Sequence, residues 1–241
     1  MNPVHMMTML PADFARMADG MMATDDMIIL GLQVGTQWDS LAHVGYDGLF
    51  YNNGPAGAVG NRTGASRNSF DKVVSHLISR GVLLDIARLK DVDRLADSCE
   101  ITSADLSAAE EEQGVRVEPG DVLMVRTGSI RWFAEGDRLR FMGDQPGLGV
   151  EAARWLHQRS VAAVAVDNAA CEVSPSPIPD ARIPFHQVVI RDMGLTIGEM
   201  FDFEALADDC EQDGVWECQF IGTGLKVTGA VGSPVTPMAL K

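Results

Sequence analysis

Apolar residues in this chain fall into short continuous runs and into segments with helical spacing, separated by glycine-rich and proline-rich stretches. Residues 27–34 (MIILGLQV), 82–86 (VLLDI), 121–127 (DVLMVRT) and 161–166 (VAAVAV) have the length and composition of strands. Continuous apolar runs are typical of strands that are covered on both faces. Residues 185–190 are a further strand candidate. The pattern therefore predicts a sheet with several buried strands.

Helical spacing of apolar residues predicts helices between these strands. Residues 103–113 are expected to form a helix with Thr102 or Ser103 as its N-cap and Gly114 at its end. The proline-rich segment 174–184 is expected to be a loop. The order of elements predicts an α/β fold with a mixed sheet in a single compact domain over residues 1–241. The other predicted elements are helices at 70–79, 150–159 and 200–208, and one or two final strands within 216–240.

Charge and composition exclude several functions. Acidic residues outnumber basic ones by 34 to 19, so the 241-residue chain has a formal net charge of −15. Such a surface repels nucleic acid and anionic lipid, and we expect neither as a partner. No run approaches the ~20 apolar residues that span a bilayer, and the N-terminus lacks the pattern of a secretory signal. Four scattered cysteines without a C-x-x-C pair favour a reducing, cytoplasmic environment.

A first group of polar residues follows the apolar run at 27–34. Gln33, Gln37, Asp39 and His43 are all odd-numbered, so an extended chain would place them on one face. A carboxylate and an imidazole on one face can bind a metal or share a proton. The alternative is a half-polar strand with an exposed aspartate and a hydrogen-bonded histidine, and spacing alone does not decide between the two.

A second pair of residues lies far along the chain. His186 and Glu199 are 13 positions apart, with residues 191–194 (RDMG) as a turn between them. The two side chains are expected to face each other across a hairpin. Taken alone, the pair is weak evidence for a site, because single histidines and glutamates are common in cores and on surfaces.

Both segments resemble the cyclase family of metal-dependent hydrolases, which includes bacterial kynurenine formamidase and isatin hydrolase. The family pattern H-x-G-T-H-x-D-x-x-x-H is matched at Gly35, Thr36, Asp39 and His43. Glutamines stand where the family has two histidines, which resembles a branch with the form G-T-Q-W-D-x-L-A-H. The surroundings of His186 and Glu199 and the closing segment 229–235 (GAVGSPV) are also similar. The resemblance covers nearly the whole chain and implies the swivelling β/β/α fold; family members often carry an additional N-terminal stretch.

The resemblance implies a ligand set and a mechanism. Asp39, His186 and Glu199 would hold one divalent metal ion, and Gln33 and Gln37 would act as weak ligands or bind water and substrate. A second ion would find glutamines in place of its two imidazole ligands, and amide oxygens are weak zinc ligands. The oxygen-rich ligand set of the first ion suits manganese or zinc. A site without metal is the alternative. His43 takes the family position of the general acid and base.

The expected function is hydrolysis of an amide, lactone or imide bond of a small cyclic or aromatic substrate by metal-activated water. The alternatives are a lyase or cyclase that uses the same site, and a metal-free binding protein. Relatives are generally oligomers, so a homo-oligomer, either a dimer or a tetramer, is expected. Four residues are candidates to contact the substrate, with core packing as the alternative for the aromatic ones: Trp38, Phe50, Tyr51 and His5.

Overall fold

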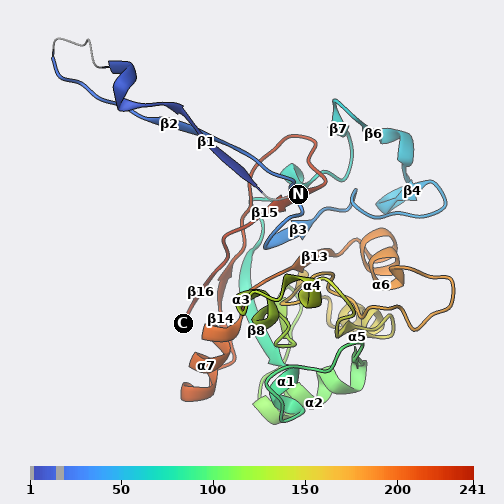
Figure 1. The fold of residues 1–241 in the computed structure, drawn as a ribbon. Coiled ribbons are helices and arrows are strands. Elements are labelled where there is room, and N and C mark those ends of the chain that lie inside the picture. Colours follow the sequence, from blue (N-terminus) through green and yellow to red (C-terminus); the bar gives the residue numbers. More distant parts are fainter. Residues whose placement is uncertain (1–2, 15–18) are drawn as a thin grey trace.

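The computed structural model describes residues 3–14 and 19–241, and an eight-stranded mixed sheet runs through its centre (Figure 1). The strand order is β15-β3-β13-β12-β10-β8-β14-β16. The four central strands β13, β12, β10 and β8 are parallel, and antiparallel strands flank them on both sides. The strands are β3 (Gln37–Asp39), β8 (Ile78–Asp85), β10 (Val122–Arg126), β12 (Ala163–Val166), β13 (Thr196–Glu199), β14 (Glu217–Ile221), β15 (Gly232–Pro234) and β16 (Met238–Leu240).

Side chains from the central strands fill a separate hydrophobic core on each face of the sheet. In β8, Val82 and Leu84 point into one core and Leu83 into the other. The same alternation holds in β12, where Val164 and Val166 lie on one face and Ala163 and Ala165 on the other. Burial on both faces explains why these strands consist of continuous apolar residues.

Helices cover both faces. The first core is closed by α2, α5 and the segment α6–η5, and the second by α7 and a group of aromatic rings. Thr102 caps α2 in a capping box with Asp105, and Gly114 ends the helix with φ of 64°. The helices are α1 (Ile86–Leu89), α2 (Ser103–Gln113), α3 (Ile130–Ala134), α4 (Arg138–Phe141), α5 (Ala152–Arg159), α6 (Pro184–His186), the π-helix η5 (Gln187–Met193) and α7 (Glu204–Asp213).

Shorter elements connect the sheet and the helices. Two-stranded ladders join β4 (Leu49–Phe50) to β5 (Gly54–Pro55), β6 (Val59–Gly60) to β7 (Gly64–Ala65), and β9 (Glu100–Ile101) to β11 (Gly147–Leu148). No helix among the described residues combines the length and the apolar character that crossing a bilayer requires. Among the described residues, the 3-10 turns are η1 (Pro11–Phe14), η2 (Tyr51–Asn53), η3 (Ala56–Ala58) and η4 (Phe70–Lys72).

The predicted α/β class with a mixed sheet is confirmed, and so are the helix at 103–113 and the strands at 82–86, 121–127 and 161–166. Two predictions of local structure are wrong. Residues 70–79 form only the short turn η4 before β8 begins, and residues 185–190 form helix instead of a strand. In the second case Pro184 starts a helix, and the apolar residues Phe185, Val189 and Ile190 share its buried side.

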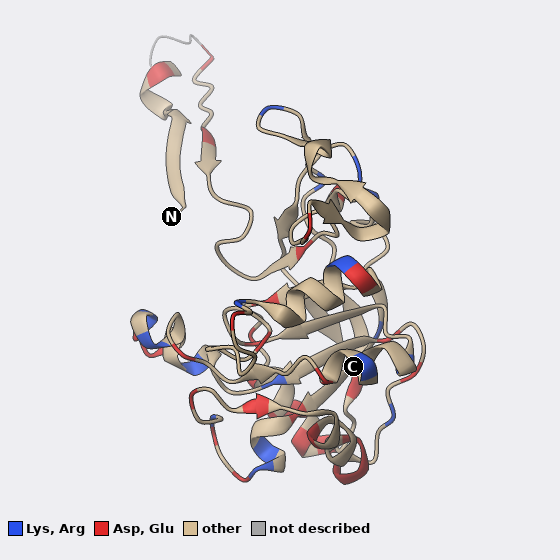
Figure 2. Ribbon diagram, turned by 90° about the vertical axis from the view of Figure 1, so that its right-hand side faces the viewer, with Lys and Arg blue, Asp and Glu red and all other residues tan. Residues whose placement is uncertain are grey.

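The predicted strand at 27–34 is shorter than expected and lies outside the core. It forms β2 (Asp25–Ile29), which pairs with β1 (Val4–Met9) in an antiparallel hairpin. This hairpin, called the arm below, projects away from the rest of the molecule in both ribbon views (Figures 1 and 2). Neither strand joins the central sheet.

Of the two alternatives for Trp38, core packing fits the structure, because its side chain is completely buried in the second core. Its ring packs edge-on against Phe201 and Phe220, and its indole N–H donates a 2.7 Å hydrogen bond to the carbonyl oxygen of Gly222. On β3 it points to the opposite face from Gln37 and Asp39, as strand alternation requires.

Replacing Trp38 by phenylalanine should therefore lower the free energy of unfolding by roughly 2–3 kcal/mol, because the variant leaves a cavity and an unsatisfied carbonyl. Urea unfolding measures this change. Trp132→Phe, which alters a partly exposed ring, is the control and should cost less. Lower substrate affinity at unchanged stability would show that Trp38 does line the substrate pocket.

Candidate metal centre

Two buried carboxylates meet where β3 pairs with β13. The antiparallel register places Asp39 opposite Ile197 and Gln37 opposite Glu199. Paired residues of neighbouring strands share a face, so the side chains of Gln37, Asp39 and Glu199 all point to the side of the first core. Asp39 and Glu199 thus lie diagonally across the ladder, within reach of one common atom.

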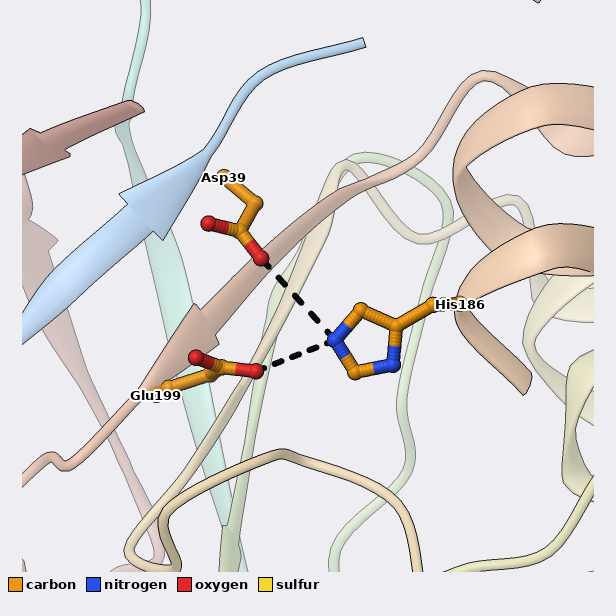
Figure 3. Close-up of side chains that lie close together, drawn as sticks. All are labelled: Asp39, His186 and Glu199. Carbon is orange, nitrogen blue, oxygen red and sulfur yellow. Dashed lines mark hydrogen bonds and ion pairs between the residues drawn. The ribbon is translucent and has the colours of Figure 1, made fainter. Parts of the chain in front are cut away.

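The third member of the cluster comes from a helix. His186 ends α6, and its Nε2 lies 3.0 Å from Oε1 of Glu199 and 3.9 Å from Oδ2 of Asp39 (Figure 3). One donor atom from each of these residues lies within 4.8 Å of the other two, and all three residues are buried. The expected hairpin between His186 and Glu199 is wrong, because a helical segment connects them, but the two side chains do meet.

Several polar atoms at this cluster have no hydrogen-bond partner among the described residues. They include both carboxylate oxygens of Asp39, Oε1 of Gln37 and Nε2 of Gln33. The side-chain amide of Gln37 donates a 2.7 Å hydrogen bond to Oε2 of Glu199. The Gln33 amide lies against Gly232, so a side chain at position 232 would overlap that amide. Gly232 belongs to β15 and pairs with Asp39 of β3. Buried unpartnered oxygens of this kind fit a site for a cation, because burying them without one is costly.

The pKa values of the ionisable groups in the cluster also fit a site for a cation. Burial raises the pKa of Asp39 well above its usual range, and the nearby negative charge of Glu199 raises it further. Burial alone would lower the pKa of His186, but hydrogen bonds to Glu172 and Glu199 raise it to about 10. Without a metal, a proton on the imidazole thus balances part of the negative charge. A divalent ion would take the place of that proton at Nε2.

His43 lies at the edge of the cluster, as expected for a group that exchanges protons with water or substrate. It follows β3 in a turn, its Nε2 is 3.7 Å from Oδ2 of Asp39, and its side chain is 33% exposed. Burial lowers its pKa from 6.5, although Glu199 acts in the opposite direction. The imidazole is therefore neutral near pH 7 and able to accept a proton.

Glu172 is a member of the site that the sequence analysis did not identify. Its carboxylate bonds Nδ1 of His186 and also accepts hydrogen bonds of 3.1 Å from the backbone N–H groups of Phe185 and His186. A carboxylate on Nδ1 fixes the tautomer in which Nε2 faces the metal and makes that nitrogen a better ligand. The only signal in the sequence is its position shortly after β12, and many residues share such a position.

Glu172→Gln should weaken metal binding, because the neutral amide holds the imidazole less firmly in the required tautomer. We expect the dissociation constant to rise about 10–100-fold, as measured by competition with a chromophoric chelator. Glu151→Gln, at an exposed position before α5, is the matched control. Unchanged metal affinity in folded Glu172→Gln protein would exclude this role.

The other predicted contact residues lie elsewhere. His5 is on β1 of the arm, where its exposed imidazole pairs with Asp26 at 2.7 Å and has no described contact with the cluster. Phe50 and Tyr51 line a separate pocket of about 330 Å³ together with Arg191 and Asp192. A role for these two rings in substrate binding stays a prediction.

A more apolar pocket is lined by residues that neighbour the cluster in the sequence, and no cluster residue is part of its wall. Thr36 and Met200, the chain neighbours of Gln37 and Glu199, form part of its wall, and the Thr36 hydroxyl donates a 2.7 Å hydrogen bond to the Met200 carbonyl. The pocket has a volume of about 330 Å³. Its remaining wall includes apolar side chains of α3 and α4, namely Ile130, Phe133 and Phe141.

Comparison with known proteins identifies the family of the chain. Residues 3–173 match the model of a protein family described as "Putative cyclase". The chain belongs to the cyclase family. A crystal structure described as a novel cyclase is 36% identical, with a TM-score of 0.91 over 100% of this chain and 82% of that chain. The predicted fold and the predicted family are thus confirmed.

Other solved structures show the same fold at lower identity. Isatin hydrolase A from Ralstonia solanacearum is 19% identical with a TM-score of 0.70, over 98% of this chain and 82% of that chain. A predicted metal-dependent hydrolase from Bacillus stearothermophilus is 16% identical with a TM-score of 0.58, over 98% of this chain and 85% of that chain. Among functionally curated proteins, none matches this sequence.

Proposed function

We propose that this cyclase-family protein is a hydrolase that uses one divalent metal ion, held by Asp39, His186 and Glu199. The observation that carries the proposal is the carboxylate of Asp39. Both of its oxygens are buried without a hydrogen-bond partner among the described residues, and it lies beside an imidazole and a second carboxylate. One nitrogen and two carboxylate ligands suit manganese or zinc and leave coordination positions for water and substrate.

A single ion is proposed because glutamines take the remaining positions around Asp39. The amide of Gln37 is already committed to Glu199 through its nitrogen, which leaves only Oε1 as a weak donor. The amide nitrogen of Gln33 is buried without a hydrogen-bond partner among the described residues, and an N–H group cannot bind a cation. Gln33 is instead a hydrogen-bond donor to a carbonyl oxygen of the substrate.

The residues around the ion have distinct roles in this proposal. A bound divalent ion lowers the pKa of water to about 7 and polarises a carbonyl group. Nε2 of His43 accepts the proton of the attacking water and returns it to the leaving nitrogen or oxygen. The Gln33 amide stabilises negative charge on the carbonyl oxygen, and Glu172 keeps Nε2 of His186 directed at the ion.

The apolar pocket beside Thr36 and Met200 supports a substrate with a hydrophobic ring. Its volume of about 330 Å³ is at the small end of ligand sites. A lactone, cyclic amide or imide of one or two rings would place its carbonyl at the ion and its apolar part against Phe133 and Phe141.

Metal content tests the proposal first. Elemental analysis should find about one manganese or zinc ion per chain in the wild type and none in Asp39→Asn. A panel of lactones, amides and imides should then give products heavier by one water. Protein that stays free of metal after dialysis against both ions would contradict the proposal and favour a binding role, whereas products that have lost water would indicate a lyase.

His43→Asn separates proton transfer from metal binding. The variant should keep its metal, since His43 is not a ligand, and lose about 10²–10⁴-fold in kcat. His76→Asn, an exposed histidine before β8, is the control and should leave kcat unchanged. Loss of the metal from His43→Asn would mean that His43 is a ligand, and the division of roles would be wrong.

A further inference from the structure

Met200 directly follows the ligand Glu199 and lies in the left-handed region of the backbone, with φ of 57°. This conformation is unfavourable for a residue with a long side chain, and such strain gathers at functional sites, where the surrounding structure enforces it. In a regular strand, residues 199 and 201 would share a face. Instead Glu199 belongs to the metal centre and Phe201 lies in the second core. The left-handed residue between them breaks the alternation of the strand.

Both main-chain polar groups of Met200 are held by other segments of the chain. Its N–H donates a 2.8 Å hydrogen bond to the carbonyl oxygen of Asn168, and its carbonyl oxygen accepts a 2.7 Å hydrogen bond from the hydroxyl of Thr36. Asn168 is completely buried, and its side-chain amide donates a 2.6 Å hydrogen bond to the carbonyl oxygen of Pro146. These contacts together keep Met200 in its strained conformation.

The side chain of Met200 forms part of the wall of the apolar pocket and packs with Ile130 and Phe141. Thr36 precedes Gln37 on β3, so it lies at the same end of the β3–β13 ladder, and it lines the pocket as well. A thioether is unbranched and makes favourable contacts with aromatic rings. Met200 therefore limits the size of the ring that can lie against it.

From these observations we infer that Met200 is a specificity-determining residue, which sets the size of the apolar group that the pocket accepts. Thr36 is a positioning residue that acts through Met200. The inference rests on the proposed function in so far as the pocket holds part of the substrate. Neither residue is a ligand of the proposed ion, so their role is separate from the chemistry at Asp39.

Binding of neutral aromatic alcohols tests the role of Met200 without any turnover. Benzyl alcohol carries one ring and naphthylmethanol two, and NMR titration gives both dissociation constants, with shifts of the Ile130 and Phe141 amide signals as the sign of binding in the pocket. Met200→Ala and Met200→Gly remove the thioether. Each should raise the affinity for the two-ring probe relative to the one-ring probe at least about 10-fold. Met142→Ala, at an exposed methionine outside the pocket wall, is the matched control and should leave this ratio unchanged.

The two Met200 variants also test the backbone strain, because both remove the side chain but only glycine adopts the left-handed conformation freely. The unfolding equilibrium constant of Met200→Gly should be about 5-fold smaller than that of Met200→Ala. Urea unfolding measures both constants. A Met200→Gly protein less stable than Met200→Ala would show that the conformation is not enforced.

Thr36→Val tests the positioning role. The variant loses the hydroxyl that holds the Met200 carbonyl, and it should lower the discrimination between the two probes about 3-fold. Thr36→Ser keeps the hydroxyl and should keep the discrimination. Equal discrimination in Thr36→Val and the wild type would exclude a positioning role for Thr36.

Metal content separates this inference from the proposed function. The Met200 and Thr36 variants should hold as much metal as the wild type. A wild type without metal would contradict the hydrolase, whereas the probe measurements on the pocket would still apply. A probe ratio that stays at the wild-type value in folded Met200→Ala and Met200→Gly, or a pocket that binds neither probe in any of these proteins, would overturn the inference.

Discussion

The site depends on one constraint, namely that two carboxylates and an imidazole are held together in a buried space. Oδ2 of Asp39 lies 3.9 Å and Oε1 of Glu199 lies 3.0 Å from Nε2 of His186, and all three residues are buried. Such a cluster is costly unless a cation balances it. The requirement for a positive charge links the geometry to the chemistry that we propose.

The fold meets this constraint through strand register. Asp39 and Glu199 are 160 positions apart in the sequence, yet the β3–β13 ladder puts both on the face that packs against α6 and η5. A shift of the register by one residue would turn Trp38 toward the metal centre and Asp39 into the aromatic core. Trp38 fits its core so closely that Gly198 and Gly222 have no room for a side chain beside it. Packing of the second core thus positions the ligands on the opposite face.

Much of the sheet could be predicted from the sequence, because its central strands are buried on both faces and so consist of continuous apolar residues. The capped helix at 103–113 was predictable for a similarly local reason. The segment around His186 was not, since its β-branched residues favour a strand, while Pro184 and packing on the first core select a helix. Motif resemblance identified Asp39, His186 and Glu199, whereas Glu172 acts through a tertiary contact with His186 that no local pattern records.

The arm is a second segment whose position could not be predicted from the local sequence pattern. Residues 27–34 have the composition of a buried strand, and the sequence alone indicates only that this apolar surface must be covered. In the structure the run lies outside the core of its own chain up to Ile29, the end of β2.

The claim of a single metal ion is tested most directly by anomalous diffraction at the manganese and zinc absorption edges, on crystals grown with both ions. Our account predicts one anomalous peak per chain, within bonding distance of Asp39, His186 and Glu199. A second peak between Gln33, Gln37 and Asp39 would contradict the role given to the glutamines. No peak at the cluster would contradict the account as a whole.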